Sequence, residues 1–302
     1  MINFIKIFVR RVLIVSGLFT FLLQPLYGQS LKKEIPLSNE LNSIKKPGQL
    51  TLSTSRSKIA VADILTNKIY VFDSRGELLW EVGDNVKIEQ PLSVCFDDEN
   101  VLCFTLKKSR FVYRVYEKKP ELIDTLKEIT TGLNQPINIV QILKDRYGNY
   151  LVLDDNNHEV LLFNKEWQFK QVLIKYGQGK GRVLFPSQLA QDISGNLIIT
   201  DQHNIPLQFF SSEGKFLFYA GWNKPGTYEG WGATAVAVDN QQTIWVTDIT
   251  NRQFRLYDVT GNEVGKIPFV LDLINPLSMV VTASNELIVS DENHGIFFYA
   301  ID

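Results

Sequence analysis

The sequence has few of the residues from which catalytic and metal sites are usually built. Its 302 residues include only two cysteines and three histidines. It contains no Cys-x-x-Cys, no spaced Cys/His zinc pattern, no His-Glu-x-x-His, no Gly-x-Ser-x-Gly and no phosphate-binding loop. No local motif for zinc, nucleophilic or nucleotide chemistry is therefore present, and we expect no cofactor and no metal site.

Long apolar runs are also missing. The uninterrupted apolar run near the start, Val12–Leu23, has 12 residues, which is short for a membrane span. Lys6, Arg10 and Arg11 precede it and Pro25–Gly28 follows, the order of a secretory signal. We expect residues 1–28 to be removed, leaving a periplasmic or secreted chain without a transmembrane segment. The alternative is an uncleaved N-terminal anchor.

An excess of basic residues is lacking as well. Without the three in the predicted signal, the 31 basic residues fall to 28 against 33 acidic ones, a formal net charge of −5. Nucleic-acid binding needs a basic face to meet the phosphates. We therefore expect no nucleic-acid partner.

What the chain does contain is a repeat, seen most clearly between Pro186 and Gly221. Polar turns in this stretch separate four short apolar segments, each typical of a β-strand. The predicted strands are Leu189–Gln191, Leu197–Thr200, Pro206–Phe210 and Phe216–Ala220. Such a four-stranded antiparallel sheet cannot bury both of its faces alone, so it must stack on copies of itself.

Copies recur at intervals of 42 to 49 residues, the period of a four-stranded propeller blade. The residues at the end of the second strand are Asp63, Thr105, Asp154, Asp201, Asp248 and Asp291. Most units open with proline or, in the fifth, threonine: Pro91, Pro136, Pro186, Thr234 and Pro276. We predict an all-β protein, a six-bladed β-propeller of four-stranded antiparallel blades spanning residues 48–302.

The last unit contains only three strands: Leu277–Val281, Glu286–Ser290 and Gly295–Ile301. A strand from the N-terminal segment, residues 29–47, can complete it and close the ring. Glu34–Leu37 is the part of that segment we expect to pair.

The units resemble the NHL repeat, in which a proline, an Asp-x-x-Gly-Asn turn, an Asp-to-Asn loop and an aromatic-ended strand follow one another. Thr247–Tyr257 carries the loop and strand, and Tyr176–Pro186 is similar to the family's glycine-rich linker. The resemblance covers about residues 48–302 and is degenerate at Thr105–Arg110. It implies a propeller that serves as an interaction platform. Similar six-bladed propellers include amidating lyases and gluconolactonase-like hydrolases, which hold a metal at the tunnel mouth.

All three histidines fall in loops between the second and third strands. They are His158, His203 and His294, with Arg252 and Lys68 at the matching positions of two other units. Imidazoles on one face can bind a metal or transfer protons. We favour structural or solvent-facing roles, because separate blades should set these side chains well apart.

Like the histidines, the recurring aspartates can be interpreted either as a binding site or as structural residues. Several carboxylates on one face could form a cation site. An aspartate followed by an asparagine three or four residues later more often caps the N–H groups of its own loop. We favour capping.

Aromatic residues gather in the fourth linker, residues 221–232. Trp222, Tyr228 and Trp231, with Lys180 and Arg182 of the preceding linker, could form a recognition patch, since aromatics and arginine dominate binding hot spots. The alternative is that the tryptophans pack over the blade interface. His158, His203 and Arg252 complete the candidate binding residues.

The two cysteines, Cys95 and Cys103, flank a turn on neighbouring predicted strands. In an oxidising compartment they could form a cross-strand disulfide, although directly paired strand positions fit disulfide geometry only marginally. Two buried thiols are the alternative, and we assign neither a function.

Two classes of function follow. The first is a non-catalytic scaffold of the cell envelope that presents its loops to a protein or polymer partner, for instance as a periplasmic subunit of an outer-membrane assembly. The alternative is a metal-dependent enzyme similar to the amidating lyases or lactonases. The absence of a catalytic motif favours the scaffold.

Overall fold

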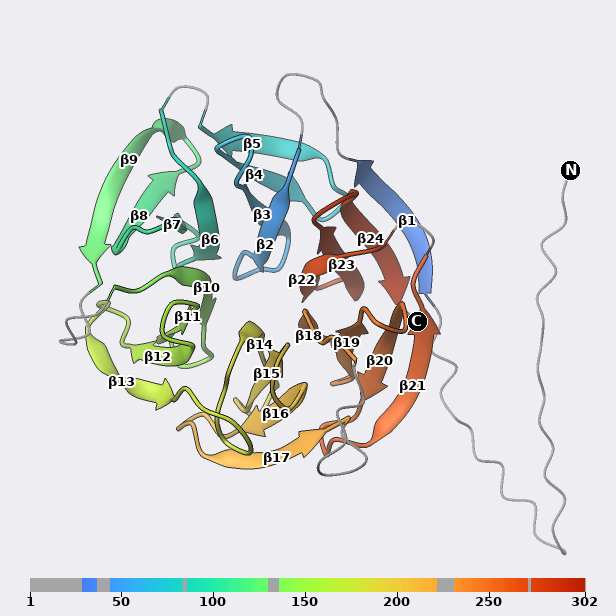
Figure 1. The fold of residues 1–302 in the computed structure, drawn as a ribbon. Helices are drawn as coiled ribbons and strands as arrows, with labels where there is room; N and C mark the ends of the chain where they lie inside the picture. The colour runs from blue at the N-terminus through green and yellow to red at the C-terminus, as the bar shows by residue number, and fades with distance from the viewer. Residues whose placement is uncertain are drawn as a thin grey trace, which may run out of the picture.

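The computed structural model describes residues 29–36, 44–83, 86–129, 136–221, 231–270 and 273–301. In this part of the chain, 24 strands form six four-stranded antiparallel sheets arranged in a ring (Figure 1). The predicted six-bladed propeller is thereby confirmed. None of the described segments forms an apolar helix of membrane-spanning length.

Blades 1 to 3 follow one another along the chain, each with its first strand at the centre of the ring. Their strands are β2 (Pro47–Leu52), β3 (Lys58–Asp63), β4 (Lys68–Asp73), β5 (Leu78–Val82), β6 (Pro91–Phe96), β7 (Leu102–Leu106), β8 (Phe111–Tyr116), β9 (Lys119–Glu128), β10 (Ile139–Lys144), β11 (Tyr150–Asp154), β12 (Glu159–Phe163) and β13 (Phe169–Ile174).

Blades 4 to 6 repeat this order, with one exception in the last blade. Their strands are β14 (Pro186–Gln191), β15 (Leu197–Asp201), β16 (Leu207–Phe210), β17 (Phe216–Ala220), β18 (Val236–Val238), β19 (Ile244–Asp248), β20 (Gln253–Tyr257), β21 (Glu263–Pro268), β22 (Pro276–Val281), β23 (Glu286–Asp291), β24 (Gly295–Ile301) and β1 (Gln29–Pro36). The predicted strands of the repeat at 186–221 agree with β14–β17 to within a few residues.

The exception is β1, which forms the outer strand of blade 6 by pairing antiparallel with β24 (Figure 1). Glu34 lies opposite Phe297 and Ile35 opposite Ile296. The predicted closure by an N-terminal strand is therefore confirmed. The strand begins earlier than Glu34, and Leu37 lies outside the described residues.

Two first strands begin a few residues after the residue that opens their unit. β10 begins at Ile139, after Pro136, and β18 begins at Val236, after Thr234. The residue that opens a unit is therefore not always the first residue of its strand.

The core lies between the blades. The described part contains six clusters of buried apolar side chains, and each joins two adjacent blades. The cluster between blades 5 and 6, for example, packs Trp245 and Phe254 against Phe297. Burying one such side chain stabilises the fold by about 2 kcal/mol. Stacking therefore supplies the burial that a single sheet could not.

Antiparallel pairing sends successive loops of each blade to opposite ends of the central tunnel. We call one end the hairpin end, because it carries the turns between first and second strands and between third and fourth strands. We call the other the linker end, because it carries the loops between second and third strands and the linkers between blades. The candidate binding residues that the structure describes all belong to the linker end.

Candidate functional site

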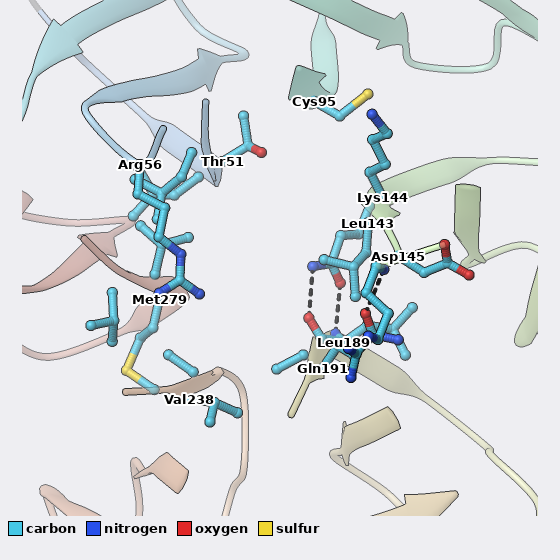
Figure 2. Close-up of a pocket in the computed structure, with 18 of the residues that line it drawn as sticks. Thr51, Arg56, Cys95, Leu143, Lys144, Asp145, Leu189, Gln191, Val238 and Met279 are labelled. Atoms are coloured by element: carbon cyan, nitrogen blue, oxygen red, sulfur yellow. Dashed lines mark hydrogen bonds between the residues drawn. The ribbon is translucent and has the colours of Figure 1, made fainter. Parts of the chain in front are cut away.

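A cavity of about 710 Å³ occupies the tunnel at the hairpin end (Figure 2). It is lined by the first strands of all six blades and by the turns that follow those strands. The repeat does not mark this site, because the two arginines at its mouth, Arg56 and Arg146, stand at turn positions that differ from blade to blade.

Buried polar side chains occupy the third position of five of the first strands and form a ring around the axis. Its members are Gln49, Ser93, Gln141, Gln188 and Ser278. The three glutamines of this ring line the cavity and form its floor. Gln49 Oε1 accepts hydrogen bonds from Ser93 Oγ at 2.6 Å and from the Val94 amide at 3.2 Å, which links blade 1 to blade 2.

Gln188 is the member of this ring that joins three blades. Its Oε1 accepts from the amides of Val236 at 3.0 Å and Met279 at 3.2 Å. Its Nε2 donates to Ser278 Oγ and to the Met279 carbonyl, both at 3.0 Å. The side chain thus joins blade 4 to blades 5 and 6, and every hydrogen-bonding position of its amide is used. A polar side chain is tolerated at this buried site because all of its hydrogen-bonding positions have partners.

The wall above the floor combines apolar and polar side chains. Leu143, Leu189, Val238 and Met279 line it (Figure 2). Cys95 also lines it, with its sulfur directed toward the Lys144 amine (Figure 2). Apolar side chains above a polar floor favour a ligand with an apolar body.

Cationic side chains stand at the mouth of the cavity. Arg56 Nη1 donates to Asn240 Oδ1 at 3.0 Å, which connects blade 1 to blade 5. Arg146 Nη1 donates to the Ile193 carbonyl in the next blade. Neither guanidinium forms an ion pair within the described residues, so most of their N–H donors remain available at the mouth.

Carboxylates at the same mouth are committed to other partners. Asp98 pairs with Lys144 across the blade 2–blade 3 boundary. Asp145 Oδ1 accepts from the Tyr147 and Asn149 amides of its own turn at 2.8 and 2.7 Å. Asp192 and Asp239 close their turns in the same manner. The carboxylates therefore hold the turns in shape, whereas the guanidinium groups of Arg56 and Arg146 face the opening of the cavity.

At the linker end, the recurring aspartates cap loops as predicted. Asp63, Asp154, Asp201, Asp248 and Asp291 are all buried at the end of their second strands. Asp201 accepts from the amide of His203 in its own loop at 3.1 Å, and from the amides of Leu184 and Phe185 in the incoming linker at 2.6 and 3.1 Å. Asp63, Asp154 and Asp291 also join a loop to a linker.

Asp248 differs from the other four because it holds a side-chain cation. Its Oδ2 accepts from Arg255 Nε at 2.7 Å, and Arg255 also lies over the Trp231 ring. Burial raises the pKa of Asp248, but hydrogen bonds from Asn251 and Arg255 outweigh burial and leave the pKa below its ordinary value. The carboxylate is therefore held ionised.

Two of the three histidines come together, contrary to the expectation that separate blades would hold them well apart. The Phe185 ring lies 4.5 Å from the His158 ring and 4.7 Å from the His203 ring, between centroids. Phe185 belongs to the linker that joins the two blades, and this position lets it bridge them. His294 instead contacts the capping Asp291 of its own loop at 3.3 Å.

The predicted recognition patch is only partly described. Trp222 and Tyr228 lie outside the described residues. Trp231 is buried in the core cluster between blades 4 and 5, and its Nε1 donates to the Gly221 carbonyl at 2.8 Å. This placement matches the alternative in which a tryptophan packs over the blade interface.

The remaining candidate residues stay at the linker end. Lys180 Nζ lies 5.0 Å from the centroid of the Tyr219 ring. The Arg182 side chain is exposed, and its carbonyl accepts from Asn204 Nδ2 and Gln208 Nε2. Arg252 donates to the Leu273 carbonyl at 3.4 Å. The structure therefore groups His158, His203, Lys180 and Arg182 around one linker and leaves Arg252 in the next blade.

Cys95 and Cys103 are directly paired across β6 and β7 and are both free and buried. A hydrogen bond with Cys103, together with burial, raises the pKa of the Cys95 thiol well above its usual value. A protonated buried thiol is a poor nucleophile. Elsewhere in the described residues, no three His, Cys, Asp or Glu side chains come together in a way that could hold a metal ion.

No family model matches the chain. Over 123 residues, 39% of its length, it is 29% identical to the Drosophila melanogaster protein Brain tumor, of which it spans 11%. This match is too short to assign a family. The resemblance to NHL repeats therefore remains a prediction.

Solved structures share the fold at low sequence identity. The Staphylococcus aureus virginiamycin B lyase is 15% identical with a TM-score of 0.60, covering 88% of this chain and 82% of the lyase. A gluconolactonase from Xanthomonas campestris is 10% identical with a TM-score of 0.65, covering 90% and 98%. Regucalcin from Agrobacterium tumefaciens, a calcium-binding protein, is 10% identical with a TM-score of 0.63, covering 85% and 90%. Such likeness establishes the propeller fold and nothing finer.

Proposed function

We propose that this propeller binds a small molecule in the cavity at the hairpin end of its tunnel. The observation that carries the proposal is a tunnel cavity whose floor is polar, whose wall holds apolar side chains, and whose mouth holds two arginines without carboxylate partners among the described residues. The volume of about 710 Å³ lies in the range of small-molecule sites.

The ligand class follows from the lining. An apolar body would pack against Leu143 and Val238, which are partly exposed apolar side chains of the wall. A carboxylate or another oxygen-rich head would accept hydrogen bonds from Arg56 and Arg146, whose planar guanidinium groups match carboxylate geometry. We therefore propose a carboxylate-bearing, partly apolar ligand.

The comparisons support a small-molecule site without identifying its ligand. Among the structural neighbours, a virginiamycin B lyase variant is described with quinupristin, and another neighbour is a gluconolactonase. Both names refer to small molecules. The scaffold that presents its loops to a protein or polymer remains a prediction, and the cavity favours small-molecule recognition over it.

Catalysis is the second candidate, because lyases and a lactonase share the fold. A metal-dependent reaction of that type needs several ligands that converge on one ion. The described residues offer no such group. We place recognition first, and stoichiometric metal in the purified protein together with lactone or lyase turnover would reverse that order.

We also propose that the chain acts after export, in the periplasm or outside the cell. The order of charged, apolar and small residues within 1–28 supports this location. Fractionation of cells that express the full chain, with N-terminal sequencing of the product, tests it. A product that begins at Met1 and remains in the cytoplasm would refute export.

The binding proposal is tested with matched pairs of arylalkyl carboxylic acids and their primary amides, measured by thermal shift and calorimetry. We expect acids to bind more tightly than amides, and Arg56→Gln with Arg146→Gln to remove that preference. Arg75→Gln is the matched control, because Arg75 is an exposed arginine of an outer turn, paired with Asp73. Failure of every acid and amide to bind would refute a small-molecule site.

A further inference from the structure

The linker between blades 3 and 4, residues 175–185, differs in composition from the protein as a whole. Its sequence, KYGQGKGRVLF, contains three cations and no acid, although the chain carries a formal net charge of −2. All three cations are exposed, and so are Tyr176 at 55% and Phe185 at 42%. We call these residues, Lys175, Tyr176, Lys180, Arg182 and Phe185, the basic aromatic ridge.

The backbone beneath the ridge is held in place by blade 4. Asn204 Oδ1 accepts from the Gly179 amide, and Gln208 Oε1 accepts from the Gly181 amide, each at 2.9 Å. Asn204 and Gln208 also donate to the Arg182 carbonyl at 2.8 and 2.7 Å. A loop fixed before binding loses little conformational entropy on binding. The ridge is thus preorganised, even though it is rich in glycine.

The cations of the ridge form no ion pair with the described part of the chain, although the charge of Lys175 acts on the pKa of Glu159. No carboxylate of the described residues lies within the 4.0 Å ion-pair distance of Lys175, Lys180 or Arg182. Lys180 instead contacts the ring of Tyr219. Surface cations that lack partners are available to an opposite charge brought by a second molecule.

The aromatic side of the ridge is built from rings of two blades. Phe185 lies between His158 and His203, and Tyr176 lies 5.8 Å from the His158 ring. The rings are tilted by 32° to 74° relative to one another. His158 Nδ1 is buried and has no hydrogen-bond partner among the described residues. Exposed aromatic groups beside unpaired cations are the residue types enriched at protein interfaces.

We propose that the basic aromatic ridge docks an acidic, aromatic-bearing segment of a partner polypeptide. Acidic side chains of the partner pair with Lys180 and Arg182, and its aromatic side chains pack against Tyr176 and Phe185. This interaction is independent of the tunnel cavity, which opens at the opposite end of the propeller.

A polypeptide fits the ridge better than a single-stranded nucleic acid does. Consecutive bases need open, parallel ring faces on which to stack. The tilted imidazoles on either side of Phe185 present ring edges instead. Nucleic acid would also meet the net negative charge of the remainder of the chain.

The test is fluorescence anisotropy with a labelled peptide of alternating glutamate and tyrosine, at low and at physiological salt. Saturable binding is expected, weakened about tenfold by Lys180→Gln with Arg182→Gln, and also weakened by Tyr176→Ser. Lys107→Gln with Lys108→Gln is the matched control, because it removes two exposed cations from a loop at the same end of the tunnel. This control variant is expected to bind as the wild type does.

Three results would overturn the proposal. Absence of peptide binding is the first, and equal weakening by the control pair, which indicates unspecific attraction, is the second. The third is tighter binding of a labelled oligothymidylate than of the peptide, which would assign the ridge to nucleic acid. Circular dichroism of each variant verifies that it is folded.

Discussion

At the linker end of the tunnel, buried carboxylates hold the loops in five of the six blades, whereas at the hairpin end partly exposed amide and charged side chains connect the turns of different blades. Asp201 and Asp291 each join a loop to a linker through several amides. At the other end, Gln242 accepts from the Ile193 amide and Asn285 from the Asn240 amide, at 2.9 and 3.3 Å. The two ends come from one repeat, yet they are held by interactions of different strength.

This difference suggests that the linker end contributes mainly to stability and the hairpin end mainly to ligand recognition. Hydrogen bonds to a buried charge contribute more than those to an exposed amide, and their loss leaves buried N–H groups without acceptors. The linker end therefore stabilises the ring. The hairpin end can adjust its turns around a ligand at little cost, and its cavity is where we propose that a small molecule binds.

The largest expected effect is at the linker end. Asp201→Ala removes the acceptor of three amides, those of Leu184, Phe185 and His203. We expect the free energy of unfolding to fall by about 3 kcal/mol, measured by urea denaturation. A loss no larger than that of an exposed substitution such as Gln178→Ala would contradict the stabilising role of this end.

The next effect concerns the polar floor of the cavity. Gln188→Ala removes four hydrogen bonds from a buried position and leaves the amides of Val236 and Met279 without their acceptor. We expect a loss of about 2 kcal/mol in the same measurement. Carboxylate binding in the cavity should weaken as well, because the floor opens; unchanged binding would show that the floor is not part of the site.

A smaller effect is expected at the hairpin end of the same blade. Asp192 closes the turn after β14 by accepting from the Asn196 amide and side chain, both at 2.8 Å. Asp192→Ala should lower the free energy of unfolding by about 1 kcal/mol, since the turn lies closer to solvent. A loss equal to that of Asp201→Ala would remove the proposed difference between the ends.

The smallest effect is one of pH and concerns Asp248. Its folded pKa lies below the ordinary value of 3.8, so the stability it contributes is complete above about pH 4 and is lost as the pH falls through the folded pKa. In Asp248→Asn that contribution is absent at every pH. The difference in unfolding free energy between the two proteins should therefore shrink below about pH 4; a constant difference would refute the linkage.

The fold could be predicted because its signal repeats. An aspartate ends the second strand in five of the six blades, with Thr105 in its place in the other, and each buried carboxylate marks the same place in a blade. The closing strand could be predicted because the last repeat contained only three strands.

The cavity could not be predicted in the same way. Arg56 and Arg146 occupy turns in which each blade carries different residues, so no period marks them. A usable signal was present in the floor, where polar residues such as Gln141 and Gln188 interrupt the apolar first strands at matching positions. The contact of His158 and His203 through Phe185 was missed because ring contacts between blades depend on a linker side chain, not on the loops alone.

The pairing of β1 with β24 also sets the order in which the ring can form. Gln29 lies opposite Ile301, so the first strand of the propeller finds its partner only after the last strand has been made. Contacts so far apart in sequence require closure of a very long loop and slow the final step of folding. During synthesis or export, five blades can assemble in sequence while blade 6 keeps an open edge. Ring closure is then the step at which the incomplete protein is most exposed to aggregation.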